Sequence, residues 1–241
     1  MGDSPVITAL PQLVDAGVPT IHLRSVNVSL PKPLGRHRGS VVRSGIDKQR
    51  VPAGTWLALT NVNLAGDAQA DLEVHGGPDK AVYAYPVEHL PAWSDELGQA
   101  GLGPAAFGEN LTTEGVTEAD VFIGDVWAWG EARLQVCQPR WPCYKLALHR
   151  QTPEVGPRMR ATGRTGWYLR VLEPGRVPVD GPVSVVERHP AALSVLDAHW
   201  AMVDRHLVGR ELVEAVAGLA VLADEWRLPL VDRLDDAGSP G

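Results

Sequence analysis

The residues best suited to chemistry lie in segment 138–146, which reads Gln-Pro-Arg-Trp-Pro-Cys-Tyr-Lys-Leu. Its two prolines fix the backbone φ angle and remove N–H donors, so the segment is a stiff loop and not a central strand. The loop presents the Cys143 thiol beside Arg140 and Lys145, and nearby positive charge lowers the pKa of a cysteine. Such a thiol suits a soft metal ligand or a nucleophile. The alternative is a buried structural cysteine, which is a common role for this residue type.

Three further segments combine glycines with polar residues: 75–82 (His-Gly-Gly-Pro-Asp-Lys-Ala-Val), 107–111 (Phe-Gly-Glu-Asn-Leu) and 163–171 (Gly-Arg-Thr-Gly-Trp-Tyr-Leu-Arg-Val). Adjacent glycines let backbone N–H groups approach an anion closely, and Lys80 adds a positive charge. Taken alone, Gly-Gly-Pro-Asp and Gly-Glu-Asn are also ordinary turn sequences. His75 is explained equally well as a hydrogen-bonded histidine of the core.

In this order the four segments resemble MOSC domains (molybdenum-cofactor sulfurase C-terminal), and in particular the stand-alone YiiM-like branch. The similarity extends from about residue 22 to the C-terminal helices. The resemblance implies a β-barrel whose loops hold molybdopterin, with Cys143 binding molybdenum as the catalytic residue. It also implies reduction of N-hydroxylated compounds. A persulfide-carrying sulfurtransferase and a cofactor carrier without turnover remain the alternatives.

The resemblance also implies which side chains hold the cofactor. The candidate cofactor-binding residues are Lys48, His75, Gly76, Gly77, Lys80, Glu109, Asn110, Arg140, Arg164, Tyr168 and Arg170. Arginine offers a planar fork for phosphate, and Tyr168 and Arg170 share one face of a strand. Lys48 is explained equally well as an exposed lysine of a turn. Cys137 falls within a strand, where a small apolar filler is expected.

Composition limits the classes of partner. The formal net charge of −7 gives no global basic surface for nucleic acid. The two cysteines exclude a disulfide framework and suit a reducing cytoplasm. We expect no signal peptide and no membrane span. Gly-x-Gly-x-x-Gly and iron–sulfur patterns are missing from the sequence, so a separate reductase would supply the electrons. A homodimer is left open.

The hydrophobic pattern predicts a mainly β fold with helices: a MOSC-type β-barrel plus a small C-terminal α-helical appendage. Alternating residues indicate strands at 21–30, 56–64 and 183–187, a short strand followed by a turn within 40–48, and a β-hairpin at 121–138. Segments 87–97 and 146–160 are predicted to contain helices. Segment 31–38, with Lys32, Arg36, His37 and Arg38, is interpreted as a basic loop, and 174–182 as a turn region.

Four divisions follow from this pattern: an extension at 1–20, the barrel at 21–188, a three-helix appendage at 189–235 and a tail at 236–241. Ser194 is a suitable N-cap for the first appended helix. Further helices are expected at 211–217 and 219–228, the last ended by Pro229. Since all the cofactor motifs lie before residue 171, the barrel is expected to hold the whole metal site.

Overall fold

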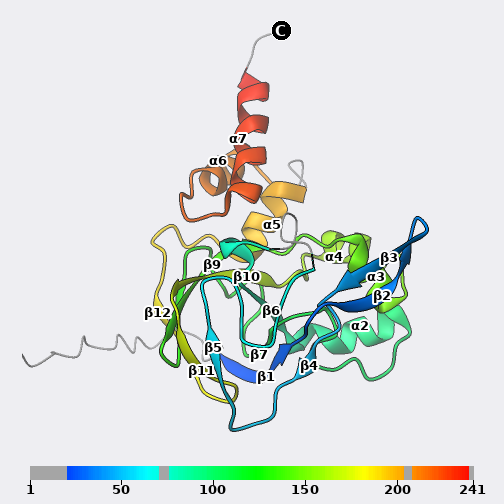
Figure 1. Cartoon of the computed structure of the whole chain (residues 1–241). Helices are drawn as coiled ribbons and strands as arrows, with labels where there is room; N and C mark the ends of the chain where they lie inside the picture. The colour runs from blue at the N-terminus through cyan, green and yellow to red at the C-terminus, as the bar shows by residue number, and fades with distance from the viewer. Residues whose placement is uncertain (1–20, 71–75, 204–207, 239–241) are drawn as a thin grey trace, which may run out of the picture.

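A strongly curled sheet organises the molecule (Figure 1). The computed structural model describes residues 21–70, 76–203 and 208–238. Eight strands follow the order β12-β8-β9-β10-β6-β7-β1-β4, and an isolated bridge between Ile21 and Val183 brings the β1 side back toward β12. The result is a half-barrel with helices around it. The predicted fold class is therefore confirmed.

The eight-stranded sheet is mixed. Its strands are β1 (His22–Val28), β4 (Gln49–Arg50), β6 (Val82–Pro86), β7 (Leu111–Glu114), β8 (Val126–Trp129), β9 (Ala132–Pro139), β10 (Trp167–Glu173) and β12 (Val183–Glu187). Within it β6 pairs with β7 in parallel, whereas the other pairs are antiparallel. The expected β8–β9 hairpin is present, with Trp129 opposite Ala132. This hairpin delivers the chain to the loop that carries Cys143.

Two small antiparallel pairs correct the predictions for the loops. Segment 31–38 contains β2 (Lys32–His37), which pairs with β3 (Ser40–Ser44). The turn region 174–182 contains β11 (Gly175–Pro178), which pairs with β5 (Trp56–Leu59). Proline and glycine content hid both strands. Each belongs to a sheet of only two strands, where a missing N–H donor is tolerated at the edge.

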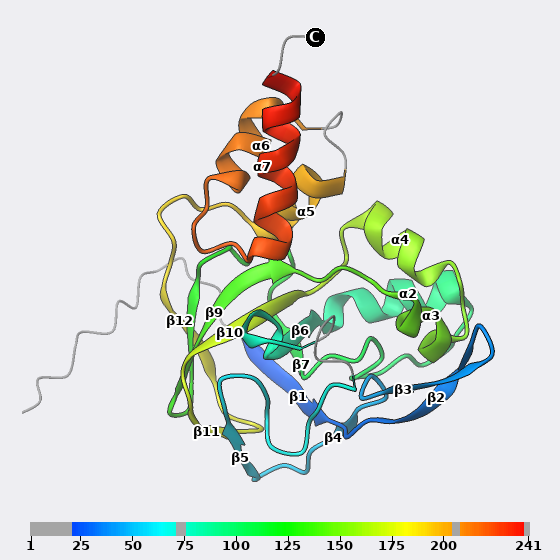
Figure 2. The ribbon, with the colours of Figure 1, turned by 45° about the horizontal axis from the view of Figure 1, so that its top comes forward.

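Three α-helices lie on the side of the sheet near β6 and β7 (Figures 1 and 2). They are α2 (Leu90–Leu97), α3 (Tyr144–Arg150) and α4 (Val155–Thr162). Two short 3-10 turns, η1 (Pro78–Lys80) and η2 (Val87–His89), flank β6. Trp93 of α2 packs with Phe107 and Met159 in a second apolar cluster. In the described part of the chain, no helix is both long and apolar enough to cross a bilayer.

The C-terminal helices α5 (Val195–Val203), α6 (Arg210–Ala217) and α7 (Asp224–Gly238) pack over the β9 end of the sheet (Figure 2). Ser194 caps α5 as predicted, because its Oγ accepts a hydrogen bond from the Asp197 N–H at 3.0 Å. Trp226 and Leu230 join the same apolar core as Trp127 and Leu134 of the barrel. The appendage therefore covers barrel surface and does not form a core of its own.

The prediction that Pro229 ends a helix is wrong. Pro229 lies inside α7, five residues after its first residue Asp224. A proline is tolerated in the first helical turn but removes a hydrogen bond beyond it. The neighbouring Leu230 is completely buried. Burial of this face against the barrel core offsets the lost backbone bond, which the sequence pattern did not reveal.

Candidate functional site

A hollow at one rim of the half-barrel collects several of the predicted residues. It contains about 600 Å³ of space not filled by protein atoms, part of it open to solvent. We call it the Cys143 hollow. The described residues that line it are Ser44, Gly45, Ile46, Lys48, Asp67, Ala68, Gln69, Ala70, Lys80, Tyr83, Gly108, Asn110, Arg140, Cys143, Lys145 and Tyr168. Three lysines and one arginine line the hollow, whereas Asp67 is the single carboxylate among these residues. The hollow is therefore suited to an anionic ligand.

Cys143 is positioned by the proline loop and by α3. Its φ and ψ of −111° and 169° are extended, and α3 begins at the next residue. The Cys143 carbonyl accepts a hydrogen bond from the Leu146 N–H at 3.0 Å, which fixes the start of the helix. The side chain is partly exposed and neither cysteine forms a disulfide. The thiol is therefore accessible to a ligand in the hollow.

Cys137 has the structural role expected for it. Its side chain is completely buried in β9, and burial raises the pKa of its thiol to about 12. The thiol donates to the carbonyl oxygen of Asp79 at 3.2 Å. It is therefore a neutral packing residue at neutral pH, unlike the accessible Cys143.

Arg140 joins three of the sequence motifs. Its guanidinium donates to the Phe107 carbonyl at 3.1 Å and to the Tyr83 hydroxyl at 3.3 Å. Tyr83 in turn donates its hydroxyl hydrogen to the Thr165 carbonyl at 2.8 Å. Arg140 is buried, yet it keeps its charge because a guanidinium does not deprotonate in proteins. These contacts hold a fixed positive charge at the wall of the hollow.

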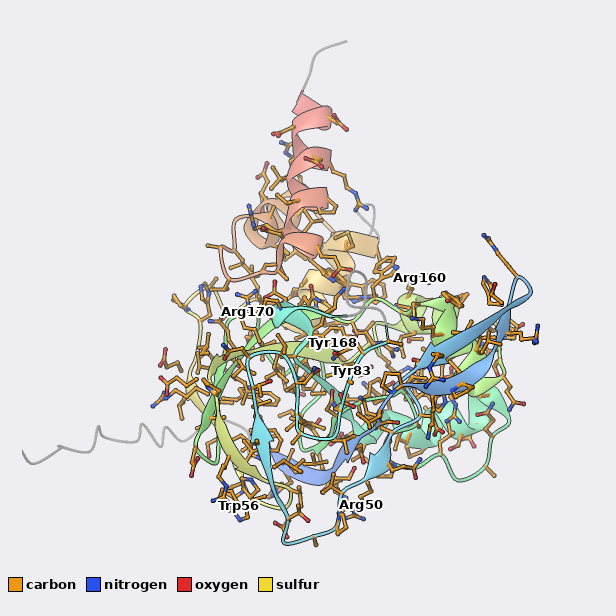
Figure 3. The ribbon with its side chains drawn as sticks, in the orientation of Figure 1. Arg50, Trp56, Tyr83, Arg160, Tyr168 and Arg170 are labelled. Atoms are coloured by element: carbon orange, nitrogen blue, oxygen red, sulfur yellow. The ribbon has the colours of Figure 1, made fainter. Side chains whose placement is uncertain are left out.

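The Tyr83 and Tyr168 rings form the base of the hollow, on neighbouring strands β6 and β10 (Figure 3). Their centroids are 5.2 Å apart. Burial raises the pKa of both hydroxyls, although Arg140 opposes the shift. Both tyrosines are therefore neutral hydrogen-bonding groups at neutral pH.

Lys48, Asp67 and Asn110 form a buried polar network that also lines the hollow. The Lys48 ammonium pairs with Asp67 Oδ1, which also accepts the Ser29 N–H at 2.9 Å. Asn110 donates to Asp67 Oδ2 at 2.9 Å and accepts the Tyr83 N–H at 3.1 Å. Burial lowers the pKa of Lys48, while Asp67 opposes that change. The contact with the Asp67 carboxylate stabilises the charged ammonium and offsets part of the effect of burial. Asn110 thus holds Asp67 in place and does not have a free edge for a ligand.

The expectation that the barrel holds the whole metal site stays a prediction. Every described residue that lines the hollow precedes residue 171, but α7 contacts two neighbouring side chains. Lys80 Nζ lies 2.6 Å from Glu225 Oε2, and the Lys80 side chain is only 15% exposed. The ring of Trp226 packs against Trp141 of the cysteine loop, with centroids 5.8 Å apart. The appendage therefore contacts both a lysine of the hollow and the loop that carries Cys143.

Other predicted residues lie behind or away from the hollow. Glu109 is completely buried and accepts hydrogen bonds from the N–H groups of Ala105 and Phe107, at 2.6 and 3.0 Å. Burial raises the pKa of Glu109, and its hydrogen bonds oppose that shift. Gly76 and Gly77 precede η1, where Gly77 has φ of 99° and its carbonyl accepts the Lys80 N–H at 3.1 Å. These residues shape the turns around the hollow and do not line it.

Two predicted arginines are committed to carboxylates outside the hollow. Arg164 pairs with Glu96 at 2.6 Å and lies over the Trp93 ring. Arg170, two residues after Tyr168 on β10, pairs with Asp79 at 2.7 Å (Figure 3). Neither arginine lines the hollow. His75 lies outside the described residues.

Comparisons with known proteins identify the family of this chain. The MOSC domain family matches residues 71–184. YflK of Bacillus subtilis, an uncharacterised protein, is 41% identical over 212 residues, which are 88% of this chain and 93% of YflK. The crystal structure of YiiM from Geobacillus stearothermophilus is 33% identical with a TM-score of 0.73, covering 89% of this chain and 99% of that one. This chain belongs to the YiiM-like MOSC family.

A third relative of this MOSC protein is a fungal protein named as a reductase. It comes from Gibberella moniliformis and is 33% identical over 201 residues, which are 80% of this chain but only 33% of the fungal protein. MOSC domains are associated in general with the molybdenum cofactor. This MOSC protein is therefore a molybdenum-cofactor-associated domain.

The residues of this MOSC protein fit such a cofactor. A partly exposed thiol lies beside Arg140, Lys48 and Lys80 in one hollow, and thiolate is a soft donor suited to a soft metal. Molybdopterin is anionic through its phosphate, which the lysines and the guanidinium complement. No group of three or more His, Cys, Asp or Glu side chains is placed for a metal ion within 21–70, 76–203 and 208–238.

Several residues of the MOSC hollow were missed from the sequence. Asp67 and Tyr83 line the hollow and Glu225 pairs with Lys80, but none of the three was among the candidate residues that the sequence suggested. A buried Lys–Asp pair 19 residues apart leaves no local pattern. The sequence suggested Lys145 only as a charge near the thiol. In the structure Lys145, two residues after Cys143, lines the same hollow.

Proposed function

We propose that this MOSC protein is an oxidoreductase that uses the molybdenum cofactor to reduce N-hydroxylated compounds. The observation that supports the proposal is the partly exposed Cys143 thiol in a hollow lined by Lys48, Lys80, Arg140 and Lys145. When bound, the cofactor supplies two-electron chemistry, which with two protons converts N–OH to N–H and water. The name of the fungal relative adds support for a reductase.

Each residue has a distinct part in the proposal. The Cys143 thiolate is the protein ligand to molybdenum, since sulfur is a softer donor than oxygen. Arg140 is held by Phe107 and Tyr83 and presents a fixed charge to the cofactor phosphate. Lys48 and Lys80 add two positive charges. A bound anion would compete with Asp67 and Glu225 for these ammonium groups. A separate reductase supplies the electrons.

The test is metal analysis combined with turnover. The protein is produced in a host that makes molybdopterin, and molybdenum per chain is measured together with reduction of N-hydroxylated compounds by reduced viologen. The proposal expects about one molybdenum per chain and turnover that is lost in Cys143→Ser. Labile sulfur without molybdenum would instead make the chain a persulfide carrier. Molybdenum without turnover on any N-hydroxylated compound would make it a cofactor carrier.

A further inference from the structure

A second hollow shares Lys48 with the Cys143 hollow. It is lined by Asp47, Lys48, the glycine-containing segment 101–106, His149 and Arg150, and we call it the Arg150 hollow. Lys48 is the one residue that lines both hollows among the described parts of the chain. His149 and Arg150 are the last two residues of α3, whose first residue follows Cys143. At 1.5 Å per residue, the seven-residue helix separates Cys143 from Arg150 by about 10 Å.

Arg150 is the unusual residue of this hollow. Its guanidinium is half-buried, and its Nε is shielded from solvent with no hydrogen-bond partner among the described residues. Its backbone is fixed, because its carbonyl accepts hydrogen bonds from Gln99 Nε2 at 2.7 Å and Thr152 Oγ1 at 3.1 Å. A buried donor without a partner is costly and is rare in native proteins.

The carboxylates near Arg150 are already used. Glu109 accepts hydrogen bonds from Ala105, Phe107 and Thr112, and Asp47 pairs with Lys32 at 2.7 Å. Lys48 pairs with Asp67. Glu109 and Asp47 therefore interact with Arg150 electrostatically, but no carboxylate in the described part of the chain forms an ion pair with it. An arginine fork in this state is suited to an oxyanion from outside.

We infer that the Arg150 hollow is a binding site for a small oxyanion, a phosphate or a carboxylate. Arg150 provides the charge, and the neighbouring His149 ring provides a hydrogen-bond donor. The His149 pKa is lowered to about 4 by burial and by Arg150, so this ring is neutral at pH 7. The oxyanion is either free in solution or the acidic group of a substrate that reacts in the Cys143 hollow, and the second case rests on the proposed function.

The His149 ring gives a site-specific test. Its NMR resonances are assigned by comparison with His149→Gln, and inorganic phosphate is then added against chloride at equal ionic strength. Bound phosphate should shift these resonances and raise the His149 pKa above about 4. In the structure burial and the positive charges of Arg150, Arg140 and Lys32 lower this pKa, whereas Asp47 raises it, and a phosphate would act in the same direction as Asp47. A ring that responds equally to phosphate and chloride overturns the site.

Arg150→Gln tests the assignment of the charge. It should weaken phosphate binding at His149 by about ten- to a hundred-fold, the usual effect of losing a bond to a charged group. The matched control is Arg36→Gln on the exposed β2–β3 hairpin, which should leave phosphate binding unchanged. Should the glutamine variant fail to fold, Arg150→Lys keeps the charge without the fork and should bind phosphate more weakly than the natural chain. Unchanged affinity in a folded Arg150 variant overturns the inference.

Substrate kinetics distinguish the two sources of the oxyanion. If the acidic group of the substrate binds here, Arg150→Gln raises KM for N-hydroxylated acids and not for neutral N-hydroxylated compounds. If KM is unchanged while phosphate still shifts His149, the site binds a free oxyanion. Absence of turnover would remove the proposed function and leave the phosphate result intact.

Discussion

Asn110→Asp tests whether Asn110 serves to hold Asp67. In the structure the Asn110 amide donates to Asp67 Oδ2 at 2.9 Å and to the Asn27 carbonyl at 3.2 Å, while its own oxygen accepts the Tyr83 N–H. The substitution keeps the size of the side chain and the acceptor for Tyr83. It replaces the donor toward Asp67 with a carboxylate oxygen.

The magnitude follows from the distance. Two negative oxygens 2.9 Å apart repel by about 6 kcal/mol at an effective dielectric constant of about 20. Protonation of the introduced carboxyl avoids this repulsion. At pH 7 it costs about 4 kcal/mol, the free energy needed to protonate a group with a normal pKa of about 3.9. Protonation is the cheaper outcome, and loss of the hydrogen bond to Asn27 adds about 1 kcal/mol. We therefore expect a loss of about 4–5 kcal/mol in the free energy of unfolding.

The pH dependence gives the sharper test. The introduced carboxyl has a folded-state pKa above its unfolded value, so the folded variant holds an extra proton in this range. Its destabilisation therefore grows as pH rises from about 4 to 7, by up to about 1.4 kcal/mol per pH unit. At pH 5 the protonation cost falls to about 1.5 kcal/mol. Urea unfolding of variant and natural chain at both pH values measures the difference.

Two further variants control this experiment. Asn61→Asp makes the same chemical change at an exposed turn position and should be nearly neutral at both pH values. Asn110→Asp combined with Asp67→Asn exchanges donor and acceptor and should recover only part of the lost stability, because Lys48 loses its carboxylate partner at Asp67. A destabilisation of Asn110→Asp that is below about 1 kcal/mol, or equal at pH 5 and pH 7, would refute the described network.

Four other results are expected. Cys143→Ser should lose molybdenum and turnover while folding normally, whereas Cys137→Ser should retain both; equal molybdenum in the two variants would remove Cys143 as the ligand. Lys80→Ala should weaken cofactor retention about ten- to a hundred-fold, measured as molybdopterin left after dialysis, and unchanged occupancy would exclude a contact. Glu225→Gln should strengthen retention by less than about ten-fold, since its half-exposed ion pair contributes about 1 kcal/mol or less; weaker retention would contradict competition for Lys80. Truncation after Glu187 should cause aggregation by exposing barrel core, and a monodisperse product by size-exclusion chromatography would contradict it.

The sequence predicted the parts of the fold that have a local pattern. The β8–β9 hairpin, the β10 alternation and the Ser194 cap each depend on neighbouring residues, and the structure has all three. The strand at 32–37 was missed because Pro33 and Gly35 hide its pairing with β3. Continuation of α7 through Pro229 depends on burial against the distant barrel core, which no local pattern shows.

The candidate site was predictable to a similar extent. Motif order located Cys143, Arg140 and Lys80, which line one hollow. Arg164 and Arg170 were equally plausible from sequence, but partners from distant segments, Glu96 and Asp79, hold them elsewhere. Which arginines face a ligand is decided by these long-range ion pairs, and their partners cannot be identified from spacing along the chain.

The bridge between Ile21 and Val183 has a consequence for the time at which the site forms. It joins the start of the β1 segment to β12, more than 160 residues later in the sequence, and β1 pairs with β7 nearly ninety residues later. Contacts so distant in sequence form late, because a long loop must close before they can stabilise anything. A nascent chain on the ribosome therefore has Lys48 and Asp67 well before it has Cys143 and Tyr168. Glu225, which holds Lys80, emerges later still. A ligand that needs the whole lining of the Cys143 hollow can therefore bind only after synthesis has passed Tyr168.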